Sequence, residues 1–131
     1  QVVIRFEPPE QAIWIQGDNA ELRQVFVNLL HNAMHAMKDG GTVSIEIETS
    51  NASVVVIRIS DTGVGIPPEN LSRIFLPFFS RRADGQAGMG LGLAVCKSIV
   101  DRCGGTIAVA SELGKNTVFT ITLPLALGVS S

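Results

Sequence analysis

Three glycines alternate with large apolar residues and lead directly into a helical pattern, in the stretch GMGLGLAVCKSIV from Gly88 to Val100. Glycine in a helix interior costs about 0.5–1 kcal/mol relative to alanine, so three glycines at one helix start require a reason. The first turn of a helix offers free N–H groups and a positive dipole end, which favour an anion. Without Cβ atoms, these amides can close around phosphate oxygens. The pattern therefore predicts a polyphosphate site, with Arg81 and Arg82 of the preceding loop as partners for the distal phosphates.

Two other phosphate-binding motifs do not fit this stretch. The dinucleotide fingerprint requires G-x-G-x-x-G directly after a strand, whereas these glycines follow a loop with the spacing G-x-G-x-G. The chain also has no G-K-[ST] sequence of the P-loop type. A different phosphate-binding fold is therefore indicated.

The rest of the chain alternates between strand and helix patterns. Short apolar or period-two runs predict strands at residues 2–7, 12–17, 42–49, 53–60, 105–111 and 116–124. Helical periods cover residues 18–37 and about 90–103, with one helical turn inside 61–75 and a loop at 76–87. With 131 residues, the chain is long enough for one domain. This order predicts an α/β fold, a two-layer α/β sandwich over residues 1–131 with the helices on one face of a mixed sheet.

Composition narrows the function classes. Hydrophobic residues make up 46% of the chain and charged residues 17%, as in a globular domain. A net charge of −2 gives no electrostatic reason to expect nucleic acid or an anionic membrane as a partner. There is no run of about 18 apolar residues and no signal-peptide pattern, and the start without Met suggests a fragment of a longer protein. Cys96 and Cys103 are too far apart on a helix to bridge, so we expect two buried thiols in a reducing cytoplasm.

A stripe of polar residues runs along the first long helix, opposite its apolar face. Its members are Glu21, Gln24, Asn28, His31, Asn32 and His35. A solvated face is usually rich in Lys and Glu, and Asn is a poor helix former, so the stripe indicates a polar ligand. The amide oxygen of Asn suits Mg²⁺ that is already bound to phosphates. His31 and His35 have the spacing to hold a transition metal instead, but the chain has no third histidine.

The sequence DTGVGIP, from Asp61 to Pro67, follows a strong strand pattern. By itself, D-x-G-x-G indicates an Asx-type turn with glycines at positive φ. Together with the other motifs, however, it resembles part of a known family. NLLHNAMHAM is similar to the N box, DTGVGIP to the G1 box, IFLPFFSRR to the F box and GMGLGLAV to the G2 box of the catalytic ATP-binding domain of sensor histidine kinases. The closing SELGKNTVFTITLP resembles the final hairpin of that domain. The family belongs to the ATPase superfamily shared with gyrase, Hsp90 and MutL, so the resemblance implies a Bergerat-type fold.

The resemblance also implies roles for individual residues. Asn32 would ligate Mg²⁺, and Asn28 would support the phosphates or the metal shell. His35 and Arg82 would reach the phosphates, and these four residues are the expected catalytic set. Asp61 would accept a hydrogen bond from the adenine amino group, and residues 77–87 would form a lid. The other nucleotide contacts implied by the resemblance are Ala36, Gly63, Gly65, Ile66, Arg81, Gly88, Met89, Gly90, Leu91, Gly92, Leu93 and Thr117.

Three positions depart from the family pattern. Met89 stands where Thr or Ser is frequent, and Asn116 stands where Gly commonly precedes the Thr of the last hairpin. Asn28 stands where the gyrase and Hsp90 branches carry a glutamate that activates water. Without that base, phosphoryl transfer is favoured over hydrolysis.

The implied activity is that of an ATP-dependent protein-histidine kinase. The domain would present Mg-ATP for γ-phosphoryl transfer to a histidine on a separate dimerisation domain, which is absent here, and a response regulator would receive the phosphoryl group next. ATP and ADP would be its ligands, and we expect a cytoplasmic domain, including as the cytoplasmic part of a membrane-anchored sensor, with no direct membrane contact. Two alternatives stay open: a stand-alone serine kinase of the anti-sigma-factor type, and a nucleotide-binding regulatory module without transfer activity.

Overall fold

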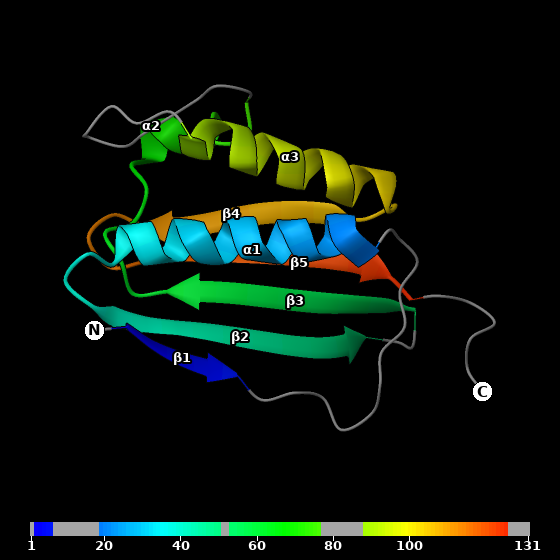
Figure 1. The fold of residues 1–131 in the computed structure, drawn as a ribbon, viewed down its shortest axis with the longest axis horizontal. Helices are drawn as coiled ribbons and strands as arrows, with labels where there is room; N and C mark the ends of the chain where they lie inside the picture. Colours follow the sequence, from blue (N-terminus) through cyan, green and yellow to red (C-terminus); the bar gives the residue numbers. More distant parts are fainter. Residues whose placement is uncertain (1, 7–18, 51–52, 77–87, 126–131) are drawn as a thin grey trace.

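Five strands form one mixed sheet in the order β1-β2-β3-β5-β4, as seen in the computed structural model (Figure 1). The structure describes residues 2–6, 19–50, 53–76 and 88–125. In chain order, the elements are β1 (Val2–Phe6), α1 (Asn19–Ala36), β2 (Gly41–Ser50), β3 (Val54–Asp61), α2 (Pro68–Leu71), α3 (Gly88–Arg102), β4 (Thr106–Glu112) and β5 (Asn116–Pro124). Strands β1 and β2 run parallel, and all other neighbours in the sheet are antiparallel. The predicted mixed sheet is confirmed.

The two central strands, β3 and β5, alternate strictly between buried and less buried residues. Alternation arises because successive side chains of a strand point to opposite faces of the sheet. The buried row of β3 is Val55, Ile57, Ile59 and Asp61, and that of β5 is Thr117, Phe119, Ile121 and Leu123. Both rows are apolar except at one end, where they finish on a carboxylate and a hydroxyl. The two buried rows, which are otherwise apolar, therefore turn polar at this end of the sheet.

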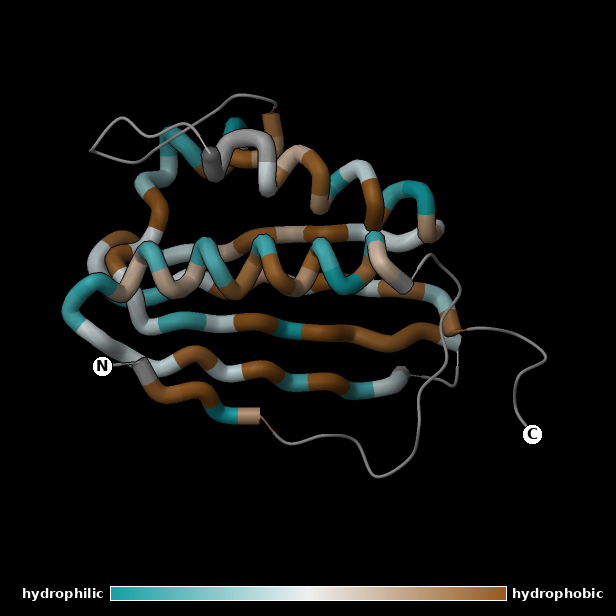
Figure 2. The backbone as a smooth tube through the Cα atoms, in the orientation of Figure 1, coloured by the Kyte–Doolittle hydropathy of each residue, from teal (hydrophilic) through white to brown (hydrophobic). Residues whose placement is uncertain are grey.

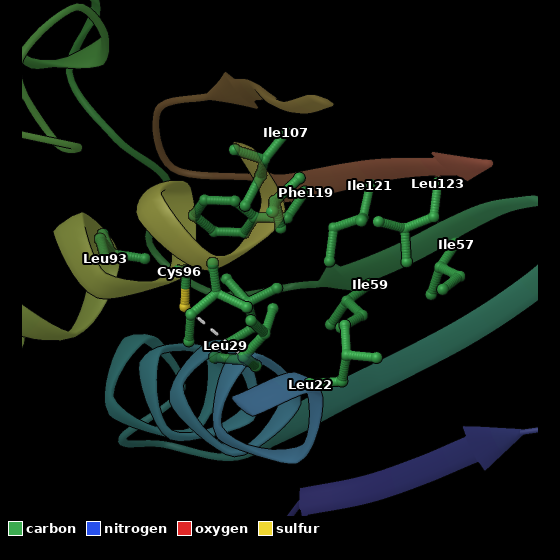
Figure 3. Close-up of a cluster of buried hydrophobic side chains, with 14 of the residues drawn as sticks. Leu22, Leu29, Ile57, Ile59, Leu93, Cys96, Ile107, Phe119, Ile121 and Leu123 are labelled. Atoms are coloured by element: carbon green, nitrogen blue, oxygen red, sulfur yellow. Dashed lines mark hydrogen bonds between the residues drawn. The ribbon is translucent and has the colours of Figure 1, made fainter. Parts of the chain in front are cut away.

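Helices α1 and α3 lie side by side over one face of the sheet (Figure 1). Buried residues of α1 recur at helical spacing: Leu22, Val25, Leu29, Ala33 and Met37 just past its end. Figure 2 shows the result as an alternation of brown and teal along α1. Figure 3 shows Leu93 and Cys96 of α3, Leu29 of α1, and Phe119 and Ile59 of the sheet in one cluster of buried side chains. The expected arrangement of helices on one face of the sheet is thus present.

Some boundaries differ from the sequence prediction. Helix α3 begins at Gly88 rather than near Gly90, so all three glycines lie within its first turns. The predicted strand at residues 12–17 and the predicted lid at 77–87 lie outside the described residues. Cys96 is fully buried as expected, but Cys103 is only partly buried, because it follows the last residue of α3 instead of lying on its inner face. Within the described ranges, no helix has the length and apolar character needed to cross a membrane.

The thiol of Cys96 is enclosed between the two helices. Its Sγ donates to the carbonyl oxygen of Val25 over 3.6 Å, the bond drawn as a dashed line in Figure 3. Burial raises the pKa of this thiol to about 11, an effect that a hydrogen bond with Asn28 partly opposes. The folded protein therefore retains the thiol proton at pH values at which an unfolded chain loses it.

We expect this thiol to make the protein less stable in alkali. Between pH 9 and about 11, the unfolded state ionises Cys96 while the folded state does not. The free energy of unfolding should then fall by up to about 1.4 kcal/mol per pH unit from this group alone. Denaturant titrations of the parent and of Cys96→Val over this range measure the difference. Cys103→Ser is the control, and it should keep most of the parent's slope; equal slopes for the parent and Cys96→Val would contradict the assignment.

Candidate functional site

A buried carboxylate and a buried hydroxyl face each other at the polar end of the sheet. Asp61 of β3 and Thr117 of β5 are directly opposed in the antiparallel register. They are only 4% and 2% exposed, respectively. Opposed residues of neighbouring strands place their side chains on the same face, so both project toward the helical layer. The fold thus brings together two residues that are 56 positions apart in the sequence and that were both predicted to contribute to the nucleotide site.

The loop that follows β3 begins with a side-chain-to-backbone turn. Oδ1 of Asp61 accepts a hydrogen bond from the backbone N–H of Gly63 over 2.8 Å. This is the Asx-type turn that D-x-G-x-G alone indicates, and Gly65 has the expected positive φ of 76°. The turn fixes the Asp61 carboxylate, since one of its oxygens is held by the backbone of its own loop.

Hydrogen bonds hold the same loop on two sides. The N–H of Val64 donates to the carbonyl of Ala36 at the end of α1 (3.1 Å), and the carbonyl of Val64 accepts from Gly114 in the β4–β5 turn (2.6 Å). The N–H of Ile66 donates to Oγ of Ser111 on β4 over 2.7 Å. The loop is therefore held between α1 and the hairpin, which limits how far Asp61 can move.

Close packing explains the two glycines of this loop. A Cβ atom on Gly63 would lie 2.6 Å from the carbonyl oxygen of Ala36, and one on Gly65 would lie 2.4 Å from that of Glu112. Both distances are far below van der Waals contact with rigid backbone. The glycines allow the loop to approach its neighbours, whatever contact they also make with a nucleotide.

Helix α1 contacts both ends of the candidate site through one row of residues spaced by four. Near its middle, Asn28 donates from Nδ2 to the carbonyl of Gly92 in α3 over 3.1 Å. At its end, the carbonyl of Ala36 accepts from Val64 in the loop after β3. Asn32 lies halfway between these two contacts on the same side of the helix. The row therefore spans from the glycine-rich start of α3 to the Asp61 loop.

Asn32 is the one member of this row with an unsatisfied side chain. It is 8% exposed, and its amide makes no hydrogen bond to any residue that the structure describes. A buried amide without partners costs about 1–3 kcal/mol, so native proteins rarely keep one without a ligand or water. Although Asn32 belongs to the polar stripe opposite the apolar side of the helix, its side chain is therefore not part of a solvated face. An amide oxygen in this place fits a hard cation that is bound to phosphates.

Both the oxygen and the nitrogen of the Asn28 side-chain amide form hydrogen bonds. Its Oδ1 accepts from Nε2 of Gln24 over 2.7 Å while its Nδ2 binds Gly92. Asn28 thus links α1 to the start of α3. A Cβ atom on Gly92 would approach Asn28 only to 3.6 Å, an ordinary contact, so packing between the helices does not by itself require glycine there.

The two histidines remain at the surface. Nδ1 of His35 lies 3.0 Å from the carbonyl oxygen of His31, and the two rings meet edge to face at 6.2 Å. Both are exposed on the outer side of α1. In the part of the chain that is described, no three His, Cys, Asp or Glu residues come together as a metal site.

The remaining predicted contacts fall into two groups. The side chains of Ile66 and Leu93 are buried in the hydrophobic core, so any contact of Leu93 with phosphate would be through its backbone. Arg81 and Arg82 lie outside the described residues, and for Gly88, Met89, Gly90 and Leu91 the structure defines only the helical backbone.

Sequence reasoning did not identify Ser111. Its Oγ donates to the carbonyl of Asn116 over 2.6 Å and lies 2.9 Å from Oγ1 of Thr117. The only signal was its place in the closing hairpin motif. Asn116, one of the departures from the family pattern, uses its Oδ1 to accept from the N–H of Glu112, so it closes the hairpin turn next to Thr117.

The close packing of the Asp61 loop against α1 and the β4–β5 hairpin leads to a stability prediction. Gly65→Ala combines positive φ with a clash against the Glu112 carbonyl, so it should lower the free energy of unfolding by about 3 kcal/mol or more. Gly114→Ala is the matched control, because its φ of 83° is similar but open space surrounds its Cβ position, and about 1–2 kcal/mol is expected. Thermal or denaturant unfolding measures both, and equal losses would show that the close approach contributes nothing.

The sequence and the fold were compared with known proteins. Residues 17–127 match the family described as histidine kinase-, DNA gyrase B- and HSP90-like ATPase. Sensor histidine kinase ZraS of Salmonella typhimurium is 44% identical over 125 residues, which are 95% of this chain and 26% of that protein. Sporulation kinase C of Bacillus subtilis is 41% identical over 111 residues, 85% of this chain and 25% of that protein. The chain thus spans about a quarter of the length of these relatives.

Solved structures agree with the family match. The nucleotide-free catalytic domain of histidine kinase ThkA superposes with a TM-score of 0.80 at 30% identity, covering 94% of this chain and 80% of that one. Full-length ShkA in complex with AMPPNP also gives 0.80 at 30% identity, over 95% of this chain and 26% of that one. The chain belongs to the family of histidine kinase-, DNA gyrase B- and HSP90-like ATPases, and it is the catalytic ATP-binding domain of its histidine kinase branch.

Proposed function

We propose that this domain binds ATP together with Mg²⁺ and presents the γ-phosphate to a histidine on another domain. The observation that carries the proposal is the amide of Asn32, which is buried and has no hydrogen-bond partner among the described residues. It lies between a glycine-rich helix start, which suits phosphates, and a buried carboxylate, which suits the amino group of a base. A magnesium nucleotide has three matching parts in the same order: phosphates for the helix start, the metal ion for the amide, and a base for the carboxylate.

Asp61 would read the base. A carboxylate accepts from the exocyclic amino group of adenine, whereas guanine has a carbonyl acceptor at the same ring position. The turn with Gly63 holds the carboxylate in place, and Thr117 lies directly across from it. Gly65 and Ile66, in the same loop, would then line the base.

The first turns of α3 would hold the phosphates, with backbone N–H groups of Gly88 to Gly92 as donors. Oδ1 of Asn32 would be the magnesium ligand, and Asn28 would fix the start of α3 through Gly92. Bound Mg²⁺ would neutralise charge on the phosphates as the terminal group leaves. His35 and Arg82 would reach the distal phosphates, and residues 77–87 would close over them.

Transfer requires parts that lie outside this chain. The acceptor histidine would come from a dimerisation domain of the longer protein, and its imidazole would take the γ-phosphoryl group as ADP leaves. A response regulator would then receive the group. The matched kinases are about four times as long as this chain, which leaves room for such domains in a longer protein. The free thiols agree with a reducing, cytoplasmic setting.

Replacing Asp61 tests the base assignment. Asp61→Asn should weaken binding of ADP and ATP by about 2–4 kcal/mol, because the amide places a donor against the adenine amino group. Calorimetry with ATP, ADP and GTP measures the effect. Glu69→Gln, an exposed carboxylate on α2, is the control for the loss of one negative charge. Equal affinities of the parent for ATP and GTP would refute the assignment.

Replacing Asn32 tests the metal site because it should weaken ATP binding in the presence of Mg²⁺ without lowering the stability of the nucleotide-free domain. Asn32→Ala should abolish the increase in ATP affinity that Mg²⁺ produces, while metal-free ADP binding stays near the parent value. Without nucleotide, the variant should be as stable as the parent or more stable by about 1 kcal/mol, since a buried unsatisfied amide is removed.

Calorimetric titration with and without Mg²⁺ gives the first quantity, and thermal unfolding of the nucleotide-free domain gives the second. His31→Ala, the exposed neighbour on the same helix, is the control and should change neither. A variant that keeps the parent's Mg²⁺ dependence would show that Asn32 has only a structural role.

A further inference from the structure

Ser111 makes three polar contacts through a single oxygen atom. The backbone N–H of Ile66 donates to its Oγ over 2.7 Å, and the carbonyl oxygen of Asn116 lies 2.6 Å away. Oγ1 of Thr117 is the third neighbour, at 2.9 Å. The contact between the two hydroxyls could run in either direction if it were considered alone.

Counting hydrogens fixes that direction. A hydroxyl has one hydrogen to donate and two lone pairs to accept with. A carbonyl only accepts, so the hydrogen of Ser111 goes to Asn116, and an amide N–H only donates, so Ile66 occupies one lone pair. The second lone pair of Ser111 must then accept the hydrogen of Thr117. Thr117 Oγ1 makes no other hydrogen bond to the described chain, so it faces the site with lone pairs only.

This orientation matters because Thr117 is opposed to Asp61. A carboxylate oxygen also accepts, and the carboxylate is held in place by the Gly63 amide. Two acceptors therefore meet at the polar end of the sheet, with no hydroxyl hydrogen available to a ligand. A ligand edge that supplies hydrogens can donate to both oxygens, whereas a carbonyl oxygen placed between them receives a hydrogen from neither.

We propose that Ser111 is a specificity-positioning residue, which takes the hydroxyl hydrogen of Thr117 and so makes the base site select a 6-amino purine over a 6-oxo purine. This inference rests on the proposed adenine site at Asp61. It adds a second acceptor to that site, set by a residue that would itself not touch the base. The discrimination is thus shared between the Asp61 carboxylate and a serine on β4 that acts through Thr117.

The test compares ADP with inosine diphosphate, which carries a carbonyl oxygen in place of the 6-amino group. In Ser111→Ala, Thr117 recovers its hydrogen and can donate it to that oxygen. The ratio of the two dissociation constants should then move toward unity by about tenfold, chiefly through tighter binding of inosine diphosphate. Ser111→Thr keeps the hydroxyl and should restore the parent ratio. Ser98→Ala, an exposed serine on α3, is the control.

A second variant keeps the test decisive if Ser111→Ala does not fold. Thr117→Val removes the acceptor at nearly constant volume and should also lower the preference for ADP, and adding Ser111→Ala to it should change the ratio no further. Thr120→Val, on the other face of β5, is its control. Circular dichroism verifies the fold of each variant. A Thr117→Val protein with the parent's ratio would overturn the inference.

The outcomes separate this inference from the proposed function. If Ser111→Ala weakens ADP and inosine diphosphate equally, Ser111 is only structural and the inference fails, while a loss of ADP binding in Asp61→Asn would still support the adenine site. If Asp61→Asn leaves ADP affinity unchanged, the base lies elsewhere, and the proposed site and this inference both fail. A changed ratio in Ser111→Ala, with parent-like ratios in Ser111→Thr and Ser98→Ala, supports the inference.

Discussion

The antiparallel pairing of β3 with β5 is the interaction on which the site depends. Its register opposes Asp61 to Thr117 and Ile59 to Phe119 on the same face of the sheet. A slip of one residue would turn the whole buried row of one strand outward. The apolar pairs of the row therefore help to hold the polar pair at its end in place, because a one-residue slip would expose the apolar side chains of one strand.

Helix α1 combines the requirements of the core with those of the site. One side buries leucine, valine and methionine against the sheet and α3, and the row of Asn28, Asn32 and Ala36 connects the start of α3 to the Asp61 loop. The Asn32 amide is buried and has no hydrogen bond to the described residues, and a buried amide that nothing satisfies costs about 1–3 kcal/mol. That cost is offset by the surrounding apolar burial, and a ligand that satisfies the amide would recover it. Asn32 would thus lower the stability of the domain at a position where it would strengthen binding of a ligand.

The glycines of the two motifs have different physical roles. Gly63 and Gly65 are required by contact with backbone carbonyls of α1 and the β4–β5 hairpin, at distances that exclude any Cβ atom. For Gly92, the nearest described neighbour of a Cβ atom would be Asn28 at 3.6 Å, an ordinary contact, so packing among the described residues does not require glycine there. The D-x-G-x-G loop is thus shaped by contacts within the protein, whereas no contact among the described residues requires glycine at position 92.

The sequence by itself determined the fold class, the family and the order of the elements, because helical and period-two spacing and four ordered motifs depend only on neighbours along the chain. It could not show that Asn32 faces inward and Asn28 binds Gly92, since the angular position of a side chain around a helix becomes burial only when α3 packs beside it. It could not show Ser111 either. The direction of the Thr117 hydroxyl follows from a carbonyl and a hydroxyl of β5 and an amide of the loop after β3, all within 3 Å of one oxygen on β4, and only the tertiary structure makes these segments meet.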